Sequence, residues 1–221
     1  MNTLALADDA LVAAQRLAEW CSRGPELEED IALANIALDQ LGTARLLLSR
    51  VGDEDHLAFL RTDREFRNCL LVELPNGDFA VTMVKLLFLA AYQKPLYEKL
   101  STDEALGPIA AKAVKESTYH LDHAQLWVKR LGDGTEESHR RAQQAVDDLW
   151  PYTHELFEPP FDDLREPWLE TVQATLGEAT LTRPEDRWRP TGGRNGVHTE
   201  HLSRLLAEMQ VLHRAHPGAT W

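Results

Sequence analysis

Apolar residues recur at helical spacing along almost the whole chain, and no segment alternates apolar and polar residues as a strand would. The break at Pro75-Asn76-Gly77 is followed by a helix for which Asn76 or Asp78 is the expected cap. Bends are expected at Pro95 and Pro151 because proline removes a backbone donor. The pattern predicts an all-α protein with helices over about 4–21, 26–51, 55–72, 78–100, 102–131, 136–157, 162–179 and 197–215.

Two of these helices are apolar around most of their circumference, over residues 31–38 and 81–92. A helix of this kind is buried on nearly all sides. A bundle of 221 residues cannot place every helix at its centre. Either other helices of the chain wrap these two, or a partner subunit covers one face.

Length and charge narrow the class of protein. A chain of 221 residues can form a single domain over 1–221. The net charge of −13 argues against nucleic acid or an anionic membrane as the main partner. The apolar run from Phe79 to Tyr92 is too short for a membrane span and contains Lys85. Cys21 and Cys69 show no pairing pattern, and no signal peptide is expected, so we expect a cytoplasmic protein.

The segment around Glu116 reads like a di-metal helix that lacks one ligand. Ferritin-like di-iron bundles carry Glu-x-x-His on two helices, which places a carboxylate and an imidazole on one face. Here Glu116 is followed three residues later by Tyr119, and His120 and His123 come at the next helical positions. A metal site with these histidines is one interpretation, and a polar seam in which Glu116 bonds His120 is the simpler one.

A second acid repeats this arrangement. Asp39 lies mid-helix and is followed three residues later by Gly42, so the imidazole is missing here too. Asp9 could supply a third acid, whereas Lys85 would repel a cation. A carboxylate-bridged di-metal site needs four carboxylates and two imidazoles. The sequence therefore predicts a degenerate site and no metal in this chain.

Two other groups of polar residues could bind a ligand. His198 and His201 form half a metal site or a solvated first turn of the last helix. The loop that precedes them is locally basic, and it could dock a phosphate or carboxylate or simply connect two helices through ion pairs to the acidic body. Its arginines are Arg183, Arg187, Arg189 and Arg194. The common cofactor and hydrolase motifs do not occur in the sequence.

Several long segments in order resemble one family. The resemblance covers nearly the whole chain and is carried by residues 20–31, 35–45, 71–79, 112–120, 130–135, 191–201 and 206–210. The chain is similar to the structural C subunits of the bacterial phenylacetyl-CoA oxygenase (1,2-epoxidase) complex of phenylacetate catabolism. The resemblance implies a ferritin-like antiparallel four-helix bundle with additional C-terminal helices, which does not itself carry the di-iron centre.

The same resemblance implies a set of partners. A homologous catalytic subunit would hold the di-iron centre and pair with this chain. An NADPH-linked flavin and iron–sulfur reductase would supply electrons, and the complex would bind phenylacetyl-CoA. Two alternatives remain open at this point: an autonomous di-iron oxygenase with atypical ligands such as His120 and His123, and a ferritin-like binding or storage protein. Self-association is a further alternative for covering the apolar helices.

Overall fold

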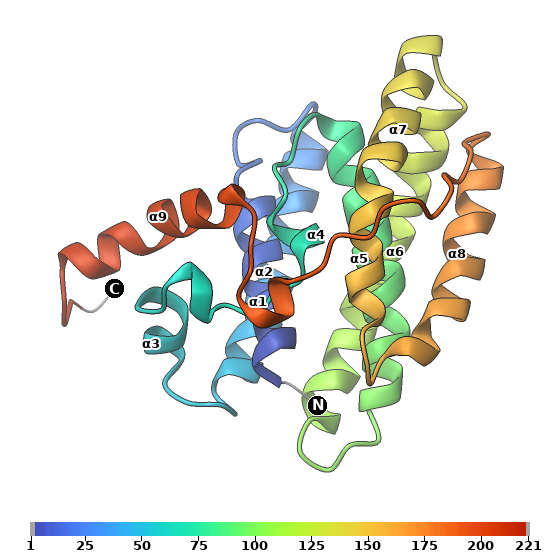
Figure 1. The fold of residues 1–221 in the computed structure, drawn as a ribbon. Coiled ribbons are helices and arrows are strands. Elements are labelled where there is room, and N and C mark those ends of the chain that lie inside the picture. The colour runs from blue at the N-terminus through green and yellow to red at the C-terminus, as the bar shows by residue number, and fades with distance from the viewer. Residues whose placement is uncertain (1–2, 220–221) are drawn as a thin grey trace. The chain divides into compact units, whose positions relative to one another are not determined.

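The computed structural model describes residues 3–219, and these form helices and connecting turns without a strand (Figure 1). The all-α prediction is therefore confirmed for the described part of the chain. The α-helices are α1 Thr3–Ala18, α2 Leu27–Leu48, α3 Glu54–Phe59, α4 Leu70–Glu73, α5 Phe79–Leu100, α6 Gly107–Gly132, α7 Glu136–Leu149, α8 Arg165–Glu178 and α9 Glu200–Ala215. Four short 3₁₀ helices are η1 Asp63–Glu65, η2 Trp150–Phe157, η3 Asp162–Leu164 and η4 Gly193–Asn195.

The helices differ most from the sequence prediction in two places, and α6 begins at Gly107 instead of about 102. The single helix expected over about 55–72 is divided into α3, η1 and α4. The helix expected over 136–157 ends as an α-helix at Leu149 and continues as η2. Pro151 lies near the start of η2, where its missing amide removes no intrahelical bond. Asp78 is the cap of α5, since its carboxylate accepts from the Val81 amide at 3.0 Å.

The chain folds into two compact units, and each is described by itself. One unit contains the described residues up to Pro75 and from Thr191 onward. The other is Asn76–Pro190. The single domain over 1–221 stays a prediction.

In the unit 76–190, α5 is the central helix. It packs against α6, α7 and α8, whose ribbons run alongside it in Figure 1. Aromatic rings fill the space between these helices: Trp150 lies 5.7 Å from Phe88 and 5.4 Å from Trp168, centroid to centroid. The Trp168 indole N–H is satisfied by the Phe88 carbonyl at 2.9 Å. The apolar helix 81–92 is thus wrapped by other helices of this chain.

In the other unit, α1 packs along α2, but α2 keeps an apolar face toward solvent. The exposed side chains are Leu27 at 70%, Ile31 at 54% and Leu38 at 64%, joined by Leu41 and the half-buried Ala34. Their spacing of four and three residues makes one straight stripe on the helix. We call these five residues the α2 stripe. By length and composition α2 and α5 would also pass as membrane spans, a test that buried core helices of soluble proteins pass as well.

The same unit buries two neighbouring aspartates of α1, and each has a guanidinium partner. Arg61 forms a two-pronged ion pair with Asp8, with its Nη1 2.9 Å from Oδ2. Arg194 does the same for Asp9, at 2.7 and 2.8 Å. Burial raises the pKa of the Asp8 carboxyl, against the opposing effect of the Arg61 hydrogen bond and charge. The pairs tie α1 to segments far away in the sequence.

A substitution of Arg61 tests how much these pairs contribute. Arg61→Met keeps an apolar stem of similar reach but leaves the Asp8 carboxylate buried without its guanidinium. We expect a loss of roughly 3–5 kcal/mol in the free energy of unfolding, because breaking a buried pair strands a charge. Urea unfolding followed by circular dichroism measures it. Arg45→Met removes the exposed pair with Glu54 and should leave the urea midpoint nearly unchanged. Equal midpoints for the two variants would contradict this account.

Candidate functional site

Helix α6 carries the residues that the sequence singles out as a degenerate metal position. His120 is buried, and Glu116 and His123 are half-buried, so the three share the inward side of the helix. Glu116 forms an ion pair with Lys112, one turn earlier on the same helix. Tyr119 is 76% exposed. The side chain at position 119 therefore lies in solvent and not in the interior of the bundle.

The other predicted acids lie in the unit that contains α1 and α2. Asp39 and Gly42 are half-buried on α2. Asp9 is buried on α1, and both of its carboxylate oxygens accept from Arg194. Among residues 3–219, no three His, Cys, Asp or Glu side chains come together as metal ligands would.

The donor set of this chain does not fit a di-iron centre. Such a centre uses four carboxylates and two imidazoles that converge on the metal ions. Here the Asp9 carboxylate is held by a guanidinium and the Glu116 carboxylate by an ammonium group. A metal at Asp9 would have to displace the Arg194 guanidinium, which contacts both carboxylate oxygens. Lys85 is buried on α5, and its Nζ lies 3.3 Å from Asn76 Oδ1, so it offers no metal ligand there.

The pair His198 and His201 is structural rather than a solvated turn. The His198 Nδ1 lies 2.7 Å from Glu73 Oε2, and its Nε2 lies 3.1 Å from the Phe66 carbonyl oxygen. Both neighbours are acceptors, an arrangement that satisfies both N–H groups of an imidazolium. The His201 carbonyl accepts from Arg16. These contacts hold the start of α9 on α4 and α1.

The four arginines of the basic loop do not form one group. Arg194 pairs with Asp9 in one unit, and Arg187 pairs with Glu185 on an exposed part of the other. Arg183 and Arg189 both contact Asp186. The docking role of all four arginines stays a prediction.

Two residues that the sequence analysis did not select complete the surroundings of Asp186. Arg165 Nη2 lies 3.0 Å from its Oδ2, and His154 Nε2 lies 3.3 Å from its Oδ1. We call Asp186, His154, Arg165, Arg183 and Arg189 the Asp186 cluster. No spacing in the sequence points to it, because η2, α8 and the following loop each contribute a part.

The pKa shifts within the Asp186 cluster follow from burial and from its positive charges. Burial opposes the charged form of Asp186, but the Trp150 hydrogen bond and the charges of His154, Arg183 and Arg165 hold the pKa of this carboxyl below its ordinary value. Burial lowers the pKa of His154, and the three arginines lower it further against the attraction of Asp186. The imidazole is therefore more readily neutral than an exposed one.

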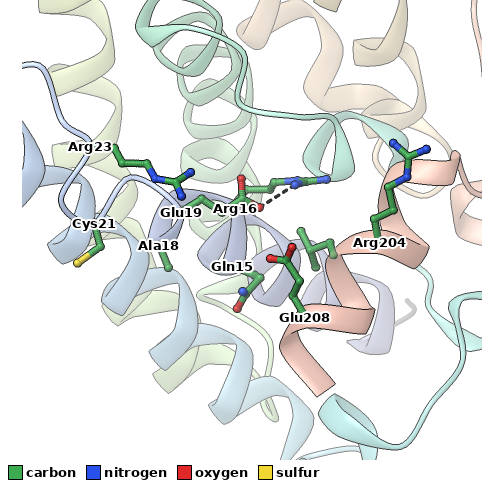
Figure 2. Close-up of a pocket in the computed structure, with 9 residues that line it drawn as sticks. Gln15, Arg16, Ala18, Glu19, Cys21, Arg23, Arg204 and Glu208 are labelled. Atoms are coloured by element: carbon green, nitrogen blue, oxygen red, sulfur yellow. Dashed lines mark hydrogen bonds and ion pairs between the residues drawn. The ribbon is translucent and has the colours of Figure 1, made fainter. Parts of the chain in front are cut away.

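Two surface depressions flank the end of α1. One, of about 520 Å³, lies between α1 and α9 (Figure 2). It has charges of both signs, from Arg16, Glu19, Arg23, Arg204 and Glu208, and Arg16 is already bonded to Glu19 at 2.7 Å. The other, of about 310 Å³, is an apolar groove between α1 and α2. This groove is lined by the stripe residues Leu38 and Leu41. It is also lined by the small side chains of Ala14, Ala18, Ala34 and Ala37.

Comparison with known proteins identifies the family. The family model described as "Phenylacetic acid catabolic protein" matches residues 2–221. The chain belongs to this family. It is also 47% identical over 241 residues to the C subunit of the 1,2-phenylacetyl-CoA epoxidase of Escherichia coli (strain K12), across 99% of this chain and 97% of that protein. The resemblance seen in the sequence and the all-α, ferritin-like fold class are confirmed.

Iron loading of this member of the phenylacetic acid catabolic proteins tests its ligand set. We expect the isolated chain to take up iron only substoichiometrically after anaerobic addition of Fe(II), because its acids are held by Arg194 and Lys112. Metal analysis of the desalted protein gives the iron content. The variant Arg194→Gln, which frees Asp9, should not bind iron either, since one released acid does not build a six-ligand site. One iron or more per chain with an oxo-bridge absorption band would contradict the degenerate-site interpretation.

Proposed function

We propose that this chain is the non-catalytic structural subunit of a multicomponent phenylacetyl-CoA epoxidase in aerobic phenylacetate degradation. The observation that carries the proposal is the near full-length match to the C subunit of such an epoxidase, at 47% identity. The chain would pair with a catalytic di-iron subunit and stabilise it. An NADPH-linked flavin and iron–sulfur reductase would supply electrons to that partner, and the assembled complex would bind phenylacetyl-CoA in the cytoplasm.

The state of the acids supports a structural role for this subunit. An oxygenase subunit must offer open metal positions and carboxylates free to bind them. In this chain Asp9 and Glu116 are paired with fixed cations. The second polar position of each motif is a glycine or an exposed tyrosine. Neither Gly42 nor Tyr119 offers the imidazole that the Glu-x-x-His motif places there.

The α2 stripe is the surface best suited to pairing. Side chains such as Leu27 and Leu38 are more than 60% exposed, although burying a leucine side chain contributes about 1.5–3 kcal/mol. A continuous apolar stripe of this kind on a soluble protein marks an interaction site. The sequence predicts that either this chain or a partner covers each apolar helix. Other helices of this chain cover α5. We propose that the partner subunit covers the exposed face of α2.

The groove beside the stripe sets the shape of that contact. The small alanine side chains that line the groove would let a partner helix approach α1 and α2 closely. Leu38 and Leu41 also line the groove and would contact that helix. An amphipathic helix laid into an apolar groove is a recurring mode of recognition. The partner would therefore present a helix whose apolar residues recur every three or four positions.

A charged substitution in the α2 stripe tests this pairing. Leu38→Glu places a carboxylate in the centre of the proposed interface but at a position that is 64% exposed in this chain. The isolated variant should melt like the unmodified protein, and it should bind the co-expressed catalytic subunit at least about tenfold more weakly. Native mass spectrometry of the co-purified complex measures the loss of pairing.

The matched control is Val211→Glu on α9, which is 60% exposed and lies outside the stripe. It should leave the complex intact. If Leu38→Glu left the complex intact as well, the stripe would not be the pairing surface. If the unmodified chain formed no complex with a catalytic subunit, the proposed function itself would be wrong.

A further inference from the structure

The Asp186 cluster gathers more positive charge than its single acid can neutralise. Three arginines form ion pairs with Oδ2 of Asp186. The Nη2 atoms of Arg165, Arg183 and Arg189 lie 3.0, 3.2 and 3.7 Å from it. Oδ1 accepts from the Trp150 indole at 2.7 Å. Three guanidinium groups thus share one carboxylate, in a protein whose net charge is −13.

Most of the donors in this cluster remain available. A guanidinium offers five N–H groups in a planar fork, and the contacts to Asp186 use one nitrogen of each arginine. The Arg183 Nε is buried and has no hydrogen-bond partner among residues 3–219. Buried donors normally have a partner, which can be an ordered water or a bound group, and this guanidinium also lies over the Trp150 ring at 5.2 Å. The Arg189 side chain is 58% exposed, which leaves the cluster accessible from solvent.

Asp186 is the acid with which all three cluster arginines form ion pairs. The strongest charges that act on His154 are the one carboxylate of Asp186 and the guanidinium groups of the three cluster arginines. Glu185 is adjacent in sequence, but it is 76% exposed and its carboxylate contacts Arg187. The cluster is therefore a locally positive surface that attracts anions to an otherwise acidic protein.

The residue that precedes Arg189 in the sequence carries an exposed aromatic ring. Trp188 is 59% exposed, although a tryptophan is usually well buried. Its ring centroid lies 5.5 Å from that of Tyr152, which holds the indole edge-on and leaves much of it uncovered. A flat aromatic ring next to arginines suits a ligand that joins a planar ring to a charged group.

We propose that the Asp186 cluster binds a phosphate dianion through Arg165, Arg183 and Arg189, with Trp188 as a platform for a ring where the ligand carries one. The charge of a dianion matches the excess of two positive charges, and the guanidinium fork matches phosphate oxygens in pairs. Two sources share this chemistry: inorganic phosphate, and the 3′-phosphate of coenzyme A. Only the second source rests on the proposed function in phenylacetyl-CoA epoxidation.

Isothermal titration calorimetry of the isolated full chain at low salt tests the proposal, with inorganic phosphate, coenzyme A and dephospho-coenzyme A as probes. We expect saturable binding that Arg183→Gln and Arg189→Gln each weaken about tenfold or more, since each removes a charge-assisted hydrogen-bond donor. The matched control Arg187→Gln lies in the same loop outside the cluster and should bind as the unmodified chain does. Asp186→Asn, which removes the competing carboxylate, should bind phosphate more tightly.

The probes separate the two sources. Tighter binding of coenzyme A than of the other two probes would support the coenzyme, and equal binding of phosphate and coenzyme A would support a free-phosphate site. Undetectable binding of all three probes, or an equal loss in Arg187→Gln, would overturn the proposal. The proposal would also be overturned if the chain failed to bind phosphate and Arg189 instead formed a salt-sensitive contact with another subunit in the assembled complex. The Asp186 cluster would then be a protein-binding surface. Because the isolated chain is used, none of the calorimetric results depends on pairing with a catalytic subunit.

Discussion

The unit that contains α1 depends on the neutralisation of buried carboxylates. Asp8, Asp9 and Glu73 are all removed from water, and an isolated buried carboxylate would cost many kcal/mol. Arg61 and Arg194 supply opposite charges to the two aspartates, and the His198 Nδ1 lies 2.7 Å from Glu73 Oε2. Arg194 and His198 come from the segment that follows Pro190, so the unit is complete only when the end of the chain has returned to α1 and α4.

The same kind of pairing bears on the proposed absence of a metal. In a ferritin-like di-iron protein, metal ions neutralise the inward-facing acids. Here Arg194 pairs with Asp9, and Lys112 pairs with Glu116. Under the proposed function, a fold of this class keeps acidic positions for stability without a metal, and the exposed α2 stripe is the surface that pairs with another subunit.

Local chemistry in the sequence is enough to predict much of the fold. The helical period identified the long helices, and the Pro75-Asn76-Gly77 break with the carboxylate of Asp78 located the start of α5. The end of α7 was harder to place, because the apolar pattern continues past Pro151 while the helix type changes. Contacts between distant segments could not be predicted in the same way. Asp9 and Arg194 are 185 residues apart, and no periodicity connects them.

The candidate site was predicted in part for the same reason. The excess of arginines in the loop is evident from the sequence. The sequence does not show that Arg165 and His154 contact Asp186, because the packing of α8 and η2 brings them there. The missing imidazoles at Gly42 and Tyr119 were visible in the sequence, whereas the cations that hold the neighbouring acids were not.

Turnover by the reconstituted complex tests the central claim, a structural subunit that enables a catalytic one, most directly. The measurement is epoxidation of phenylacetyl-CoA by the catalytic di-iron subunit with its reductase, in the absence and in the presence of this chain, with the iron content of each subunit determined. The account predicts that the catalytic subunit alone is poorly active or insoluble, that adding this chain restores activity, and that the iron stays with the catalytic subunit. Turnover by this chain and the reductase alone would contradict it and would make the chain an oxygenase in its own right.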